Sequence, residues 1–315
     1  MDILSAVKDH KRIAIGGHVR PDGDCIGSCL AVYNYILDNT EGKDVHVFLN
    51  EIPNLFKFLK NSDRIEEAGE AFSPFDLFIC LDCGDISRLG KSEIYFKEAK
   101  HTFCIDHHIQ KGSFADINDV DPENSSTCEM VFDRMNKDLI DEKIAECLYS
   151  GIVTDTGVFQ YSCTKSSTMK AAAFLMDKGI PYPEIVNRVF FEKTFEQNQV
   201  LGYALMNAEL YLDGRVIVSY IPSSIMKKYH ALPKHMEGIG AALRSTKGVE
   251  VSVFAYDTLE NTLKVSLRAG ETKVNLSDIA SHFGGGGHAK ASGCLVKKPF
   301  ENFRDKVLEL IAEEI

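Results

Sequence analysis

Short apolar runs alternate with longer helical patterns through the N-terminal half of the chain. The apolar runs predict strands at residues 13–15, 44–50, 75–81 and 101–105. Apolar positions at helical spacing predict helices that begin near Cys25, after a capping box at 126–129, at about residue 142 and at Ser166. This alternation is typical of an α/β fold with a doubly wound, mainly parallel sheet, in which ligands gather at the carboxyl ends of the strands.

The C-terminal part repeats the mixture of strands and helices on a smaller scale. Strands are predicted at 216–221, 249–257, 262–269 and 293–296, and a helix from Phe300 to Ile315. The stretch from Pro183 to about Tyr211 looks helical but irregular, and we interpret it as a linker. The predicted organisation is therefore an N-terminal domain at 1–185, a helical linker at 186–210 and a smaller α/β domain at 211–315.

Composition limits the class of protein and its partners. With 315 residues, 44% hydrophobic and 26% charged, the chain reads as an ordinary soluble protein without a membrane span or signal peptide, and we expect a cytoplasmic location. Its nine scattered cysteines suggest no disulfide framework. A net charge of -11 argues against a partner that is long nucleic acid, which requires an extended basic face. Phosphates would instead be bound through metal ions and a few local cations.

Carboxylates and imidazoles follow the predicted strands. The segment from His18 to Asp24 follows the first strand, and Pro21 and Gly23 allow its side chains to converge on one point. The whole set, each member at a strand or helix end, is His18, Asp22, Asp24, Asp82, Asp106, His107, His108 and Asp155. Taken singly, these residues could belong to solvated turns. Together they suit Mn²⁺, Mg²⁺, Fe²⁺ or Co²⁺ better than structural zinc. Two divalent cations would neutralise the set, with Asp82 as the natural bridge.

Five ordered motifs resemble the DHH phosphoesterase superfamily. Four of them are HVRPDGDCIGS at 18–28, LDCGD at 81–85, DHH at 106–108 and GIVTDTG at 151–157. The fifth, GGGGHAKASG at 284–293, is similar to the signature of the DHH-associated C-terminal domain. Within the superfamily, the chain is most similar to the bacterial nanoRNase A group of bifunctional oligoribonucleases and pAp phosphatases. Arg20 departs from the motif without an evident reason.

The resemblance implies a role for each member of the N-terminal set. One cation would be held by His18, Asp22 and Asp82, and the other by Asp24, Asp82, His107 and Asp155. Asp106 would orient its neighbours. His108 would face the phosphate as a hydrogen-bond donor or general acid.

The second domain offers candidates for binding a further phosphate. Glycines bring main-chain N–H groups close to an anion, and the candidates are Gly285, Gly286 and Gly287 with His288. Arg268, at the end of the strand predicted at 262–269, suits a terminal phosphate, and Arg88 is a weaker candidate. The alternatives are a flexible glycine turn and a surface arginine. The resemblance favours the binding role and implies an active-site cleft between the two domains.

The resemblance implies a two-metal phosphoesterase that uses Mn²⁺. Its substrates would be 5′-phosphorylated di- to pentanucleotides of RNA or DNA, cleaved to mononucleotides, and pAp, cleaved to AMP and phosphate. The rival activities are a pApA or cyclic di-AMP phosphodiesterase and a manganese-dependent pyrophosphatase. A silent nucleotide-binding module should have lost ligands, and none is missing. A processive exonuclease fits the acidic charge poorly, and a homodimer is left open.

Overall fold

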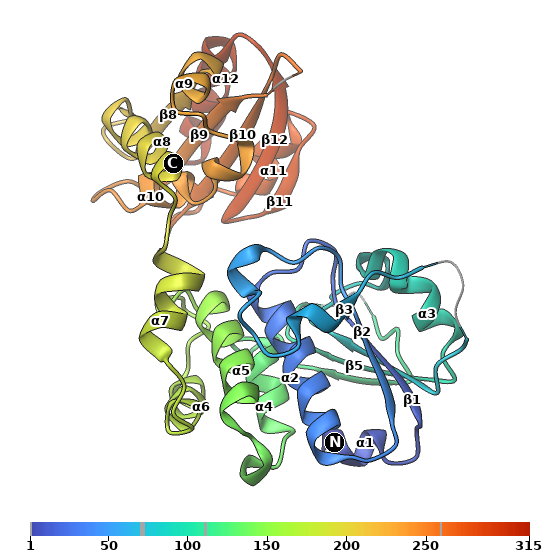
Figure 1. Cartoon of the computed structure of the whole chain (residues 1–315). Coiled ribbons are helices and arrows are strands. Elements are labelled where there is room, and N and C mark those ends of the chain that lie inside the picture. Colours follow the sequence, from blue (N-terminus) through green and yellow to red (C-terminus); the bar gives the residue numbers. More distant parts are fainter. Residues whose placement is uncertain (1, 70–72, 110–111, 259) are drawn as a thin grey trace. The chain divides into compact units, whose positions relative to one another are not determined.

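The computed structural model describes the whole chain except residues 1, 70–72, 110–111 and 259. The chain forms two compact units, Met1–Glu192 and Lys193–Ile315 (Figure 1). Each unit contains a six-stranded sheet with its own hydrophobic core. The predicted α/β class, with a mainly parallel sheet in the first domain and a smaller α/β domain after it, is confirmed; the sheet of the second unit is mixed.

The sheet of the first unit is parallel throughout. Its strands are β1 (Arg12–Gly16), β2 (Asp44–Phe48), β3 (Ile65–Glu66), β4 (Leu77–Leu81), β5 (His101–Asp106) and β6 (Ile117–Val120). They lie in the order β3-β2-β1-β4-β5-β6, so the direction of winding reverses between β1 and β4. In a doubly wound sheet, such a reversal opens a crevice at the carboxyl ends of the two strands.

Helices cover both faces of this sheet, which explains why its central strands are apolar without a break. In β1, Ile13 and Ile15 belong to the core on one face, and Ala14 belongs to the core on the other. The first core contains residues of α1 (Ile3–Val7), α2 (Gly23–Asn39), α4 (Thr127–Asp133), α5 (Glu142–Asp155) and α6 (Ser166–Met176). The second contains aromatic residues of α3 (Glu93–Glu98). Four 3₁₀ turns complete the connections, at Asn54–Phe56, Ser62–Arg64, Ile86–Ser92 and Lys137–Leu139.

The irregular helical stretch spans the boundary between the units. It contains α7 (Tyr182–Val186), a π-helical turn at Asn187–Phe191 and α8 (Phe195–Met206). Thr194 and Gln197 form a reciprocal capping box at the start of α8. The residues assigned to a linker thus include a complete helix that belongs to the second unit.

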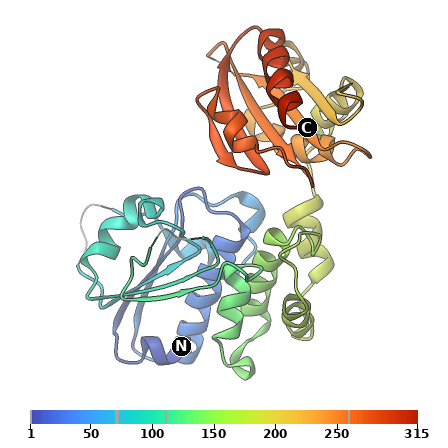
Figure 2. The same cartoon turned by 180° about the vertical axis from the view of Figure 1, so that it is seen from behind.

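The second unit contains a mixed sheet in the order β11-β12-β10-β9-β8-β7. Its strands are β7 (Glu209–Tyr211), β8 (Val216–Ile221), β9 (Val251–Asp257), β10 (Thr262–Ala269), β11 (Gly286–His288) and β12 (Ala291–Lys297). Only β8 and β9 are parallel among these described pairs. One face packs against α11 (Leu276–Ser281) and α12 (Phe300–Glu314), the red C-terminal helix in Figure 2. The other packs against α8 and α10 (Ile239–Arg244), and α9 (Ser223–Lys228) and η6 (Pro233–Met236) connect β8 to α10.

The structure differs from the predicted elements at several points. The strand predicted at 75–81 begins only at Leu77, because the side chain of Asp76 accepts the main-chain N–H groups of Lys11 and Arg12 at 3.1 and 2.9 Å. Four short strands, β3, β6, β7 and β11, were not predicted, since two to four residues are too few to show alternation. Part of the glycine run, expected as a turn, is strand β11.

Of the two hydrogen bonds in the capping box predicted for α4, the one to the Ser126 hydroxyl forms and the one to the Glu129 carboxylate does not. The Ser126 hydroxyl accepts the N–H of Glu129 at 3.0 Å. The Glu129 carboxylate accepts hydroxyl hydrogen bonds from Ser125 and Thr168 instead of returning to the cap. Among the described helices, none is both long and apolar enough to cross a bilayer.

Candidate active site

The candidate ligands lie where β1, β4 and β5 end and where α2 begins. The chain leaves β1 through His18, and Asp22 then caps α2 by accepting the N–H groups of Asp24 and Cys25, both at 3.2 Å. Gly23 is required here, because a Cβ at this position would lie 2.2 Å from the hydroxyl oxygen of Thr154 on α5. Close packing of α2 on α5 brings Asp24 toward Asp155, the last residue of α5.

Asp82 occupies the centre of the set and is 1% exposed. Its Oδ2 lies 3.4 Å from Nε2 of His18, and its Oδ1 lies 3.6 Å from Nε2 of His107. One carboxylate thus faces an imidazole on each side. This is the arrangement that a ligand shared by two cations requires.

His18 presents one ring nitrogen to the centre. Its Nδ1 lies 2.9 Å from the carbonyl oxygen of Val19, so this nitrogen carries the proton and Nε2 faces Asp82 and, at 3.7 Å, Asp22. Burial opposes protonation, but hydrogen bonds to Asp22 and Asp82 raise the pKa of His18 to about 10. For Asp22, desolvation opposes ionisation, but the hydrogen bond and charge of His18 and the N–H groups of Cys25 and Asp24 outweigh it and lower the pKa.

On the other side of Asp82, His107 contacts two more carboxylates. Its Nε2 lies 3.2 Å from Oδ2 of Asp155 and 3.7 Å from Oδ2 of Asp24. Burial and the charges of Asp82 and Asp22 raise the pKa of Asp155 to about 8. Burial, Asp82 and Asp155 also raise the pKa of Asp24 well above its ordinary value.

The donor set fits divalent cations. Asp24, Asp82 and Asp155 form no ion pair with a lysine or arginine within the described part of the chain, and the charge of Asp82 adds to the effect of burial in raising the pKa of Asp24 and of Asp155. Among the residues that the structure describes, three triads have ligand atoms within 4.8 Å of one another: His18, Cys25 and Asp82; Asp82, His107 and His108; and Asp24, His107 and Asp155. The sequence analysis missed Cys25, whose thiol pKa is raised by burial, so that it is a poor ligand beside the carboxylates.

His108 is held by Asp106, which is completely buried at the end of β5. Nδ1 of His108 lies 2.8 Å from Oδ1 of Asp106, which also accepts the His108 main-chain N–H at 3.2 Å. The hydrogen bond to Asp106 raises the pKa of His108 against the effect of burial, and the charge of Arg88 lowers it. The main-chain carbonyl oxygen of Arg88 accepts the N–H of Val19, next to His18, at 2.7 Å. Arg20 is exposed with a left-handed backbone (φ 56°), and nothing in the structure explains it.

In the second unit, Arg268 and Gly286 line a cavity of about 470 Å³. In β10, Leu263, Val265 and Leu267 belong to the core, whereas the alternate side chains Lys264, Ser266 and Arg268 line the cavity. The sequence analysis missed Lys264, although the alternation of the strand places it on the face of Arg268.

Of the remaining residues of the glycine motif, Ala291, Ser292 and Gly293 also line this cavity, whereas Gly285, Gly287 and His288 do not. A Cβ on Gly285 would lie 2.3 Å from the carbonyl oxygen of Gly293, and Gly287 has a φ of 146°. These two glycines therefore allow β11 to pack against β12. His288 is exposed at the end of β11.

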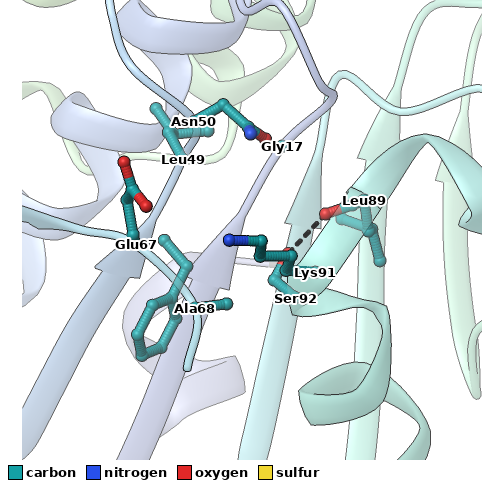
Figure 3. A pocket seen from close by; sticks show the side chains of 9 residues that line it. Gly17, Leu49, Asn50, Glu67, Ala68, Leu89, Lys91 and Ser92 are labelled. Atoms are coloured by element: carbon teal, nitrogen blue, oxygen red, sulfur yellow. Dashed lines mark hydrogen bonds between the residues drawn. The ribbon is translucent and has the colours of Figure 1, made fainter. Parts of the chain in front are cut away.

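A smaller cavity lies near the carboxyl ends of β1 and β2 (Figure 3). Its volume is about 20 Å³, and Gly17, Asn50, Glu67 and Lys91 are among the residues that line it. This is enough for about one water molecule and far too little for a nucleotide.

Two family models match the chain in the order that the motifs predicted. The DHH family, N-terminal domain, matches residues 12–152, and the DHHA1 domain matches residues 213–315. The chain carries a DHH domain followed by a DHHA1 domain. Of the eight carboxylates and imidazoles of the candidate site, all but Asp155 lie within the matched part of the DHH domain, and the cavity lies in the DHHA1 domain. DHH proteins use divalent cations, in agreement with the donor set described above.

Several relatives match this chain over most of its length and most of their own. A protein of Thermus thermophilus named bifunctional oligoribonuclease and PAP phosphatase NrnA is 28% identical over 100% of this chain and 93% of its own length. A Mycoplasma genitalium protein of the same name is 28% identical over 94% of this chain and 92% of its own length. The crystal structure of an exopolyphosphatase-related protein from Bacteroides fragilis superimposes with a TM-score of 0.87, at 29% identity over 97% of this chain and 94% of that chain.

Proposed function

We propose that this DHH–DHHA1 protein is a divalent-metal-dependent phosphoesterase that cleaves short 5′-phosphorylated oligonucleotides to mononucleotides and pAp to AMP and phosphate. The observation that carries the proposal is the buried Asp82 carboxylate, which faces His18 on one side and His107 on the other. The names of the relatives support the choice of substrates.

The chain's own residues would divide the chemistry between them. His18, Asp22 and Asp82 would hold one cation, and Asp24, Asp82, His107 and Asp155 the other. When bound, the two cations would lower the pKa of the attacking water and neutralise charge on the phosphoryl oxygens. Asp106 accepts a hydrogen bond from Nδ1 of His108 and raises the pKa of this imidazole, so that the protonated ring could donate a second hydrogen bond from its opposite nitrogen to the phosphate or the leaving group. Arg88, whose charge acts on His108 and whose main chain contacts Val19, would add a second hydrogen-bond donor.

The cavity of the DHHA1 domain would bind another part of the substrate. The charged residues that line it are Lys234, Glu237, Lys264 and Arg268, which leaves two positive charges in excess. This local excess contrasts with the net charge of -11 of the whole chain. We propose that Arg268 and the main chain at Gly286 bind a phosphate and that Lys264 and Lys234 add affinity for the nucleotide beside it. Gly285, Gly287 and His288 would shape and complete the edge of this site.

Manganese is our choice of working cation, because imidazole and carboxylate ligands together suit it. We also propose a cytoplasmic location, where short RNA fragments and pAp would be encountered. The nine cysteines, all free in the structure and eight of them buried, fit a reducing compartment.

A single comparison of substrates tests the proposal. Metal-free protein is reloaded with Mn²⁺ or Mg²⁺ and assayed with pAp, pApA, cyclic di-AMP and pyrophosphate at equal concentrations. We expect hydrolysis of pAp and of pApA, none without added cation, and little with the other two compounds. Turnover of cyclic di-AMP or pyrophosphate well above that of pAp would overturn the substrate assignment, and activity that survives complete removal of cations would overturn the mechanism.

A further inference from the structure

Thr127, the first residue of α4, contacts two candidate ligands at once. Its hydroxyl donates to Oδ1 of Asp82 at 3.0 Å, and its main-chain N–H donates to Oδ2 of Asp24 at 2.7 Å. The neighbouring N–H of Cys128 donates to the other oxygen of Asp24 at 2.8 Å. Thr127 is completely buried, so no water replaces these contacts. One residue thus connects the end of β4 to the start of α2.

The hydrogen bond from Thr127 fixes the side chain of Asp82, a residue whose backbone conformation is unfavourable. Asp82 has a φ of 54°, in the left-handed region that costs most residues about 1–2 kcal/mol. Its main-chain N–H donates to the carbonyl oxygen of Ile105 at 3.1 Å, which fixes the backbone but leaves the carboxylate free to rotate. Among the described residues, the Thr127 hydroxyl is the only non-histidine side chain that forms a hydrogen bond or ion pair with this carboxylate.

The geometry determines which lone pairs of Asp82 remain for a metal. A hydroxyl has one proton, and an ionised carboxylate can only accept, so Thr127 is the donor. The bond occupies one lone pair of Oδ1. The remaining lone pairs include that of Oδ2 on the side of His18 and that of Oδ1 on the side of His107.

We propose that Thr127 is the positioning residue of the metal centre: its hydroxyl holds Asp82 in the orientation in which one carboxylate serves both cations, while its N–H fixes Asp24. The inference rests on the metal centre of the proposed function and is independent of the substrate. Partners of this kind typically contribute 10- to 100-fold to metal affinity, because they hold a ligand in its binding orientation before the metal arrives.

Titration of metal-free protein with Mn²⁺, followed by calorimetry, tests this role without substrate. Thr127→Val keeps the shape and the N–H but removes the hydroxyl, and it should weaken Mn²⁺ binding about 10- to 100-fold. Thr127→Ser restores the hydroxyl and should bind Mn²⁺ within about threefold of the wild-type affinity. If Thr127→Val yields too little folded protein by circular dichroism, Thr127→Ala, which cannot crowd Asp82, should show the same loss.

Thr168→Val is the matched control. The Thr168 hydroxyl is also completely buried and donates at 2.7 Å to a buried carboxylate, that of Glu129. Thr168→Val should lower the melting temperature while leaving the Mn²⁺ affinity within about threefold of wild type. The proposal is overturned if Thr127→Val retains wild-type Mn²⁺ affinity, or if Thr127→Ser loses as much affinity as Thr127→Val. Because the readout is metal binding, failure of the nucleotide assays would not affect this result.

Discussion

At the scale of single residues, the site depends on Asp82, whose backbone adopts an unfavourable left-handed conformation. Asp82 combines a left-handed backbone, almost complete burial and three imidazoles, those of His18, His107 and His108, close to its oxygens. Strained residues of this kind persist where surrounding contacts determine their conformation, and they cluster at functional sites. Asp82 is held by the Ile105 carbonyl group and the Thr127 hydroxyl, from two different elements.

Asp82→Asn should leave the fold intact and reduce turnover of pAp by more than about a hundredfold, because the amide removes the negative charge that both cations need. Asparagine tolerates the left-handed backbone, so the expected loss is chemical rather than structural. Asp213→Asn is the control, since Asp213 is exposed and has a φ of 57°. Turnover near the wild-type rate, with two Mn²⁺ ions still bound to Asp82→Asn, would refute the shared-ligand assignment.

At the scale of elements, the side chains on one face of β10 pack in the core, and those on the other face line the cavity. Its apolar side chains pack toward α11 and α12, and its polar side chains line the cavity of the DHHA1 domain. The cavity remains open partly because its walls contain small residues, including Gly240, Gly286 and Gly293. Substrate affinity should therefore be separable from chemistry at the metal centre.

Arg268→Ala should weaken binding of pAp and of 5′-phosphorylated dinucleotides about 10- to 100-fold, since it removes a charge-assisted contact with a phosphate. Hydrolysis of bis-p-nitrophenyl phosphate, which has no second phosphate, should change much less. Steady-state kinetics on both substrates make the comparison, with Arg304→Ala on α12 as the control. Equal losses on both substrates would assign Arg268 to the fold or to the metal centre.

Asp257 at the end of β9 contacts residues of β8, of α9 and of the segment before α12. The Asp257 carboxylate accepts hydrogen bonds from Tyr220 at 2.6 Å and from the Ser223 N–H at 2.8 Å, and it pairs with Lys298 at 2.8 Å. Burial alone would raise the pKa of Asp257, but these three partners lower it below its ordinary value of 3.8. A lowered pKa in the folded state means that this stabilisation is present above pH 3.8 and is lost as the pH falls below it.

Asp257→Asn should therefore lower the free energy of unfolding by about 1.5–3 kcal/mol at pH 7, and the difference from wild type should shrink as the pH falls from about 4 toward 3. Calorimetric melting at a series of pH values provides the measurement. Asp305→Asn, which alters an exposed pair with Arg304, should have little effect at any pH. A destabilisation that is constant down to pH 3 would show that the charge of Asp257 is not the stabilising factor.

At the scale of the whole molecule, the sign of the net charge differs from the sign of the charge in the cavity of the second unit. The chain carries a net charge of -11, while the cavity in its second unit carries an excess of positive charge. In a longer substrate, the phosphates beyond the first few would lie against a chain of negative net charge. Affinity should therefore not grow with substrate length as it does on an extended basic groove.

We expect kcat/KM on 5′-phosphorylated RNA to be highest at two to five nucleotides and to fall for longer chains, with a shallow dependence on salt. The reason is that few phosphate contacts release few counterions. Oligomers of increasing length assayed at low and moderate salt provide the test. A preference for chains of twenty nucleotides or more, with a steep salt dependence, would instead indicate a processive exonuclease.

The sequence by itself determined the class of fold, the positions of the long strands and the kinds of side chain that gather at the candidate site. Those properties depend on local periodicity and on which residues follow each strand, so β8 and β10 have the predicted bounds of 216–221 and 262–269. The ordered motifs also indicated both domains, which the family models confirm.

The tertiary structure decided which groups actually meet. Thr127 reaches Asp82 across 45 residues, and Cys128 reaches Asp24 across 104. No pattern in a single sequence encodes contacts at such separations, and Thr127 reads in the sequence as the first residue of a capped helix. The partner of Glu129 was likewise not predictable. Its carboxylate was expected to accept a hydrogen bond at the start of α4, but it accepts one from the Thr168 hydroxyl, because packing of α4 against α6 brings that hydroxyl within reach.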